Sequence, residues 1–156
     1  MKYFIFLIFL FSFLSYSQEC RVIEWKGHGM SSCQDSLIET IDFKNGFFNK
    51  SISLNKIYFE TIPVDSKQVD LEFYDLEFTN LTEDELNIIS LKDLGEEILV
   101  DYNVVTKRKK HFLCFQFIPF RIHDDIIQKL DRFKLKIEPS NETVESGKKI
   151  INNSVL

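Results

Sequence analysis

The segment that most constrains the fold is residues 111–120, HFLCFQFIPF, which carries apolar side chains at both parities of an extended chain. Successive side chains of a strand point to opposite faces, so a strand that is apolar at both parities needs cover on both faces. The segment therefore predicts a central strand of a packed sheet. Pro119 has no N–H to donate to a neighbouring strand, so regular pairing is expected to stop near it.

Hydrophobic alternation predicts several more strands and one helix. Apolar residues alternate with acidic ones along residues 69–73, and the pattern resumes one position out of phase at residues 76–78, which predicts an antiparallel strand with one slip. Thr82, with Glu85 three residues later, predicts a capping box that begins a short helix. Further strands are predicted at residues 21–25, 47–60 with a kink, 97–106 and 133–137, and residues 36–43 are predicted to be either a strand or a helical turn. Polar loops are predicted at residues 26–35 and 121–125, a turn at Asn45-Gly46, and a break at residues 62–64.

These elements together predict an all-β fold, namely an antiparallel β-sandwich with one short helix. The chain has 16 phenylalanines, which provide ample bulk for a core. Its formal net charge of -5 argues against a nucleic-acid-binding protein, since that class carries a basic surface.

The first residues predict export. Lys2 provides a positive charge, residues 3–14 are almost wholly apolar, and Ser15 and Ser17 are small residues at the positions that a signal peptidase reads. Residues 1–17 are therefore predicted to be a signal peptide, because the apolar run is shorter than the ~20 residues that span a membrane. No transmembrane segment is expected after cleavage, so the mature chain is expected to be exported.

The remaining chain divides into two parts by composition. Residues 18–138 contain all the predicted strands and form the predicted sandwich module. After Pro139 apolar residues nearly vanish, and they return only at residues 150–156. Residues 139–156 are therefore predicted to be an exposed linker and the start of a further domain.

Three cysteines remain after signal cleavage. Because exported proteins meet an oxidising environment, Cys20 and Cys33 are candidates for a disulfide, the alternative being three free thiols. Cys114 lies in the most apolar strand and is expected to be a buried thiol that packs as a small hydrophobic residue.

The sequence offers no convincing catalytic or metal site. His28, between two glycines, and Cys33 bring an imidazole and a thiol into one segment, but Cys33 follows in a serine-rich loop and does not end a second buried strand. Cys20, His28 and Cys33 are three zinc-ligand types without the close paired spacing of structural zinc sites. We therefore predict no catalytic residue, no metal ligand and no cofactor, and we expect structural or solvated roles for the other two histidines, His111 and His123.

A run of four cations interrupts an otherwise acidic chain before the central strand. The run is Lys107, Arg108, Lys109 and Lys110, and it is expected at the tip of a β-hairpin. Two interpretations are open: the tip contacts an acidic partner surface or anionic lipid head groups, or it is simply solvated, which is the commoner role of such a tip.

Several short motifs, taken in order, resemble a known family. They are IEW at residues 23–25, FIPF at residues 117–120, KLDRFKLKIE at residues 129–138 and NNSVL at residues 152–156. In this order they resemble the N-terminal region of the type IX secretion system sortases, the PorU group of gingipain-family cysteine peptidases. In that group a step like NSVL leads into the next domain, so the resemblance implies that this chain stops where that domain would begin.

The resemblance implies a module without activity of its own, because no residue here matches the family's histidine and cysteine, which belong to a separate downstream domain. Gingipain propeptides are β-rich and act as intramolecular chaperones and inhibitors. The chain is thus expected to be a propeptide-like module that binds or supports downstream peptidase domains or other secretion-system proteins. The resemblance also implies a location in the periplasm or on the cell surface, associated with the outer membrane. The alternative is a stand-alone secreted adhesin or ligand-binding β-sandwich module.

Overall fold

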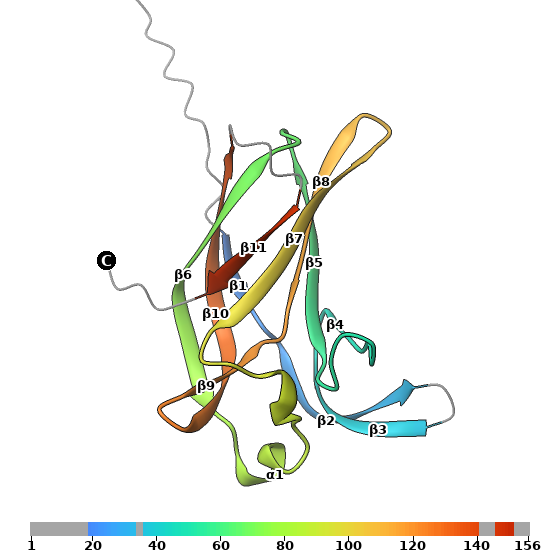
Figure 1. The fold of residues 1–156 in the computed structure, drawn as a ribbon, viewed down its shortest axis with the longest axis vertical. Coiled ribbons are helices and arrows are strands. Elements are labelled where there is room, and N and C mark those ends of the chain that lie inside the picture. The colour runs from blue at the N-terminus through green and yellow to red at the C-terminus, as the bar shows by residue number, and fades with distance from the viewer. Residues whose placement is uncertain (1–18, 34–35, 141–145, 152–156) are drawn as a thin grey trace, which may run out of the picture.

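The computed structural model describes residues 19–33, 36–140 and 146–151. Within these residues all strand pairings are antiparallel and only one short α-helix occurs, so the prediction of an all-β sandwich is confirmed. Two larger sheets lie face to face, and a two-stranded ribbon projects at one end beside the helix (Figure 1). The predicted signal peptide and the end of the predicted next domain lie outside the described residues.

The elements are as follows. The four-stranded sheet contains β1 (Glu19–Val22), β10 (Ile126–Pro139), β6 (Val69–Asn80) and β9 (Phe120–His123). The five-stranded sheet has the order β11 (Ser146–Ile151), β7 (Ile98–Lys107), β8 (Lys110–Phe117), β5 (Ile57–Val64) and β4 (Gly46–Phe47). The ribbon pairs β2 (Trp25–Cys33) with β3 (Ser36–Phe43), and the helical elements are α1 (Glu83–Leu86) and the 3-10 helix η1 (Leu91–Asp93).

The predicted central strand is confirmed as β8, which lies between β7 and β5 and ends at Phe117, before Pro119. One face of β8 enters the core, where Leu113, Phe115 and Phe117 are buried. The expectation that both faces are covered is wrong, because Phe112 and Cys114 on the opposite face remain partly exposed. β8 is therefore an interior strand of its sheet, but only one of its two faces is covered by the second sheet.

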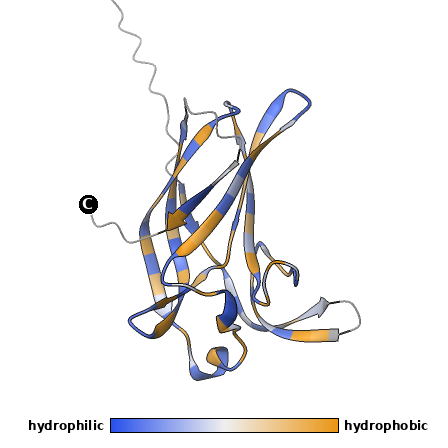
Figure 2. Ribbon diagram, in the orientation of Figure 1, coloured by the Kyte–Doolittle hydropathy of each residue, from blue (hydrophilic) through white to orange (hydrophobic). Residues whose placement is uncertain are grey.

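An aromatic cluster joins the two sheets across the core. The ring of Phe133 in β10 lies 5.6 Å from that of Phe73 in β6 and 5.7 Å from that of Phe117 in β8, measured between centroids. Tyr58 in β5 stacks on Phe117 at 5.0 Å. These distances are typical of favourable aromatic pairs, and they connect rings from both sheets into one core. Figure 2 shows the underlying alternation of hydrophobic and hydrophilic residues along β6 and β10.

The predicted slip and capping box are both present. In β6, Phe73 pairs with Leu135 and Phe78 with Leu130, and the register shifts between these pairs near Asp75, whose φ of 50° is left-handed. This bulge returns the apolar side chains to the core after the change of phase. At α1, Glu85 N–H donates to Thr82 Oγ1 at 3.3 Å, and Thr82 N–H donates to Glu85 Oε2 at 2.9 Å.

Two segments that were predicted to be polar loops are largely strands. Residues 26–33 supply most of β2, which pairs with β3 along its length, and this pairing also settles residues 36–43 as a strand. Residues 121–123 supply most of β9, while Asp124 and Asp125 form the tight turn that joins it to β10. Neither predicted segment has a clear apolar alternation, so the extended state of both depends on hydrogen bonds to a partner strand.

The strand predicted at residues 47–60 is wrong over most of its length, and the break predicted at residues 62–64 is also wrong. The structure has the two-residue β4 there, and β5 begins only at Ile57 and continues through Pro63 to Val64. The N–H of Phe59 points to the side of β5 opposite β8 and donates to Asn45 O at 3.1 Å. Because backbone N–H groups alternate in direction along a strand, the position at which Pro63 lacks an N–H faces the same side. Since β4 does not extend that far, Pro63 lies at a free sheet edge, where a proline breaks no ladder.

Part of the predicted linker and next domain belongs to this fold. Residues Ser146–Ile151 form β11, which pairs with β7, and Ile151 is fully buried in the core. Pro139 likewise still pairs with Val69 as the last residue of β10. The segment was missed because it is short and mostly polar, and only its pairing with β7 makes it a strand.

Candidate interaction surfaces

The predicted catalytic candidates do not form a dyad. His28 lies in β2 opposite Ile41, and its Nδ1 is 3.5 Å from Glu39 Oε1. Cys33 is five residues further along the same extended strand, which separates the two backbones by about 16 Å. Within the described residues no group of three or more histidine, cysteine or acidic side chains is placed to hold a metal ion.

The other two histidines make local contacts. His111 Nδ1 lies 2.8 Å from Thr106 Oγ1 on the paired strand β7. His123 Nε2 lies 3.6 Å from the carboxylate of the neighbouring Asp124, and both side chains are exposed.

The cysteines differ from their expected roles. Cys20 is a free, exposed thiol in β1 that shares a shallow surface hollow with Arg132 and Lys134. Cys33 lies at the far end of the β2–β3 ribbon, so the predicted Cys20–Cys33 disulfide is not formed, because the two strands carry the residues apart. Cys114 is a free thiol that is only partly buried, since it faces outward from β8, with its Sγ 3.7 Å from Thr61 Oγ1.

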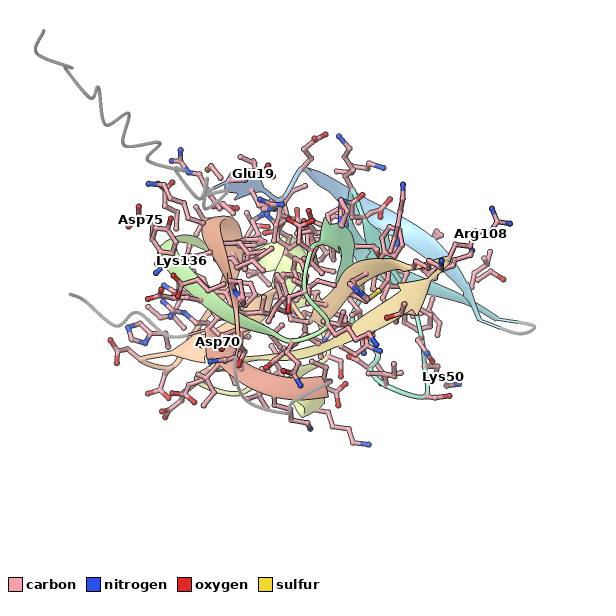
Figure 3. The ribbon with its side chains drawn as sticks, turned by 90° about the horizontal axis from the view of Figure 1, so that it is seen from above. Glu19, Lys50, Asp70, Asp75, Arg108 and Lys136 are labelled. Carbon is pink, nitrogen blue, oxygen red and sulfur yellow. The ribbon has the colours of Figure 1, made fainter. Side chains whose placement is uncertain are left out.

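The basic tip consists of Lys107, Arg108, Lys109 and Lys110 at the end of the β7–β8 hairpin, where the sequence placed it. Lys107 pairs with Lys110, and the two residues between them have left-handed φ values of 50° and 65°. All four side chains are exposed, and none of the four forms an ion pair with another described residue. Figure 3 shows Arg108 projecting away from the body of the protein.

Below the tip lies the open face, which we define as the outward side of the five-stranded sheet. Its cross-strand rows are Val105, Phe112 and Pro63; Asn103, Cys114 and Thr61; and Asp101, Gln116 and Phe59, with Leu99 and Ile150 beyond them. Large apolar side chains stay exposed here, at 42% for Phe59, 45% for Val105 and 57% for Leu99. A hollow of about 590 Å³ lies on this face between Phe59, Val105 and Cys114.

The outward side of the four-stranded sheet, here called the ionic face, has the opposite character. Cations of β10 pair across the strands with acids of β6, as Lys134 does with Asp75 at 2.6 Å, Lys136 with Glu72 at 3.7 Å and Arg132 with Glu77. The hydrogen bond to Asp75 raises the pKa of the Lys134 ammonium. A face covered by exposed ion pairs is well solvated and needs no partner.

The two sheets also meet along an open flank between β1 and β5. Arg21 in β1 forms an ion pair with Glu60 in β5 at 3.1 Å, and Glu60 also accepts a hydrogen bond from Tyr58 Oη at 2.9 Å. Burial, and then the negative charge of Glu60, raise the pKa of the Tyr58 hydroxyl. A groove of about 500 Å³ runs beside this pair, with Ile62, Val64 and Ile137 among its lining residues.

The sequence predicted the basic tip but missed the open face. The available signal was the outward row of β8 together with alternate residues of β7, but the apolar residues at that parity were interpreted as a second buried face. Among the described residues, no helix combines the length and hydrophobicity that a membrane crossing requires.

Comparison with known proteins finds a similar fold among solved structures but no similar sequence. No protein-family model and no curated protein sequence matches this chain. The fold is similar to that in the structure of the complex of the pro- and mature domains of RgpB from Porphyromonas gingivalis, with a TM-score of 0.50 and 11% sequence identity. The match covers 87% of this chain and 82% of that chain. At this identity the likeness shows a shared fold and nothing more.

Proposed function

We propose that this chain is a non-catalytic, propeptide-like N-terminal module of an exported gingipain-type cysteine peptidase of the type IX secretion sortase group. In this role it binds the peptidase domain and supports its folding, in the periplasm or at the cell surface. The observation that carries the proposal is the fold, which is similar over most of both chains to a structure of gingipain pro- and mature domains. The motif resemblance of residues 23–25, 117–120 and 129–138 supports the sortase group within that family.

The site chemistry is consistent with a binding role. His28 is distant from Cys33, and the exposed features of the described chain are a partly apolar sheet face and a cationic tip, both of which suit protein contacts. A module of this kind would act by covering and steadying another domain, without a reacting group of its own.

The test is binding and refolding with the gingipain-type peptidase domain encoded by the same gene or locus. We expect a one-to-one complex by size-exclusion chromatography with light scattering, and a higher yield of active peptidase when the domain is refolded in the presence of this chain. A monomer that neither binds nor assists the peptidase contradicts the proposal and favours the stand-alone adhesin.

A peptidase assay on the purified chain alone tests the absence of activity. We expect no turnover of peptide substrates by the wild-type chain, and the same background from the Cys33→Ala variant. Turnover that disappears in Cys33→Ala contradicts a non-catalytic module.

A further inference from the structure

The two outward faces of the sandwich differ in how many of their charges are paired and in how much apolar surface they expose. On the ionic face the three cross-strand pairs neutralise one another. On the open face the single pair is that of Lys148 with Asp101 at 3.8 Å, among the described residues, and large apolar side chains are exposed around it. Large apolar side chains exposed on a sheet face favour a protein contact, whereas a ladder of ion pairs favours solvent.

We propose that the open face, together with the basic tip, is the surface that docks on the peptidase domain, at a site where apolar side chains lie beside acidic ones. This inference rests on the proposed function and names the surface that performs it. The contact has an apolar centre around Phe59 and Val105, and a charged margin at the tip, which is the usual arrangement of a protein–protein interface.

Charge complementarity identifies the kind of partner. The four cations of the basic tip have no acidic partner among the described residues, although the chain as a whole carries a net charge of -5. A cationic group at the rim of an apolar contact attracts an acidic surface and increases the association rate. Val105 and Phe112 pair on the same β7–β8 hairpin as the tip, separated from it by the Thr106–His111 pair, so one hairpin presents both parts of the contact, and Pro63 lies beside them in β5.

The course of the chain is compatible with a partner on this side. The described chain ends at Ile151 in β11, the edge strand of the same five-stranded sheet. A peptidase domain joined after that point, as in the proposed function, begins beside the sheet whose outward face is open.

The groove on the flank is a weaker candidate for the same role. A partner strand added to β5 would need the backbone groups on its free edge, but Pro63 has no N–H to offer on that side. The ion pair of Arg21 with Glu60 also spans the flank and would have to open. Docking on the face leaves both features intact.

Two native thiols allow the faces to be compared in one experiment. Cys114 lies on the open face, and Cys20 pairs with Lys134 on the ionic face. In a Cys33→Ser background, alkylation of each thiol by iodoacetamide is followed by mass spectrometry, with and without the peptidase domain encoded with this chain. At a peptidase concentration ten times the Kd, we expect alkylation of Cys114 to slow by about tenfold and that of Cys20 to stay unchanged.

A second probe and a matched pair of variants keep the test decisive. If Cys114 reacts too slowly in the free chain, Val105→Cys in a Cys20→Ser, Cys33→Ser and Cys114→Ser background provides an exposed thiol on the open face. Val105→Glu places a charge in the apolar centre and is expected to weaken binding by about tenfold or more. Val22→Glu, at a residue that is 61% exposed in β1, is the control and is expected to bind normally.

Charge reversal tests the tip separately. Lys109→Glu with Lys110→Glu is expected to weaken binding and to remove most of its dependence on ionic strength, since the tip contributes chiefly long-range attraction. Lys92→Glu, an exposed lysine of η1, is the control with unchanged binding.

The outcomes separate this inference from the proposed function. A complex in which Cys114 stays reactive overturns the docking face and leaves the proposed function standing, while the absence of any complex overturns both. Protection of Cys114 in the concentrated chain alone identifies a second copy as the occupant and overturns the inference. Tip-dependent binding to vesicles of phosphatidylglycerol, with peptidase binding unaffected by charge reversal, identifies a lipid contact for the tip and overturns its assigned role.

Discussion

Glu85 shows how a single side chain connects a local motif to the fold. The residue is only 7% exposed, and its carboxylate accepts hydrogen bonds from Thr82 N–H within the capping box and from Lys129 Nζ in β10 at 2.6 Å. Burial by itself would raise the pKa of this carboxyl group, but the bonds from Lys129 and Thr82 outweigh burial and lower it. The capping box, which the sequence predicted, is therefore also the anchor of α1 to the four-stranded sheet.

The lowered pKa predicts a specific dependence of stability on pH. The folded-state pKa of Glu85 lies below the unfolded value of about 4.3, so its ionised form stabilises the fold above that value and the contribution is lost as the pH falls through the folded pKa. We expect Glu85→Gln to lower the free energy of unfolding by about 3 kcal/mol at neutral pH, because it leaves Lys129 without its buried partner. Urea unfolding between about pH 7 and about pH 3 measures both effects, and the variant should lose less stability than the wild type on acidification.

Glu83→Gln is the matched control for this prediction. Glu83 lies in the same turn but is exposed, so the free energy of unfolding of Glu83→Gln is expected to follow the wild-type pH curve within about 0.5 kcal/mol. Equal losses in the two variants would mean that the ion pair with Lys129 does not stabilise the fold.

At the scale of elements, the β7–β8 hairpin carries strain at its tip. Arg108 and Lys109 have φ values of 50° and 65°, a left-handed conformation that suits a two-residue hairpin turn but that Asn-Gly adopts at lower cost. We expect Arg108→Asn with Lys109→Gly to raise the free energy of unfolding by about 1 kcal/mol, as measured by urea unfolding. If the open face docks as proposed, the same variant also binds the peptidase domain more weakly, since it removes two of the four cations.

The β9–β10 turn offers a comparison within the same chain. Asp124 and Asp125 have φ values of 50° and 61° in a turn of the same length, away from the basic tip. Asp124→Asn with Asp125→Gly is expected to stabilise the fold by a similar amount without any effect on peptidase binding. A loss of stability in both variants would show that left-handed strain does not limit these hairpins.

The strand β11 tests whether residues beyond the predicted module belong to this domain. Ile151 is fully buried, whereas its neighbour Ile150 is 48% exposed on the open face. We expect Ile151→Ala to lower the free energy of unfolding by about 3 kcal/mol, as for other core truncations, and Ile150→Ala to lower it by less than about 1 kcal/mol. Equal, small effects by urea unfolding would place the end of the domain before β11, where the composition of the sequence placed it.

At the scale of the whole molecule, ion pairs at both flanks connect the two sheets. Lys149 in β11 lies 2.6 Å from Asp70 in β6 at one flank, and Arg21 in β1 lies 3.1 Å from Glu60 in β5 at the other. The side chains of the second pair are only 12% and 20% exposed, so removal of one partner leaves a poorly solvated charge.

This geometry predicts non-additive effects at the Arg21–Glu60 pair. We expect Arg21→Met to lower the free energy of unfolding by about 2 kcal/mol, and Arg21→Met with Glu60→Gln to recover part of that loss. Arg132→Met breaks the exposed pair with Glu77 and is expected to change the stability by less than about 1 kcal/mol. A double-mutant cycle by urea unfolding provides the measurement, and strict additivity would show that the pair does not join the sheets.

Much of the fold was predictable where the information is local. Alternation along β6, the bulge near Asp75, the capping box of α1 and the hairpin under the basic tip all depend on neighbours in the chain, and the structure confirms each of them. The strands β2, β9 and β11 were missed because none of them shows a clear apolar alternation, and their extended state depends on pairing with a partner strand.

Arg121 illustrates the same limit at the level of one residue. Because Arg121 is a charged residue in a polar segment, the sequence predicted a loop, yet the residue is only 5% exposed. Its guanidinium lies 3.5 Å from the centre of the Phe78 ring and donates a hydrogen bond to Gln128 Oε1. Burial lowers the pKa of this group, and the ring and the amide compensate for part of its lost hydration.

The sequence by itself determined which residues lie on the same side of each strand, because that parity depends only on the two-residue repeat of an extended chain. It also determined that the chain would form β structure with one capped helical turn. Only the tertiary structure decided which of the two apolar sides of β8 is buried, because the second sheet can cover one side of the five-stranded sheet and leaves the other to solvent. The open face is the side of β8 that the second sheet does not cover. The alternation of side chains along a strand is a local property, whereas burial of one side depends on where strands distant in sequence pack.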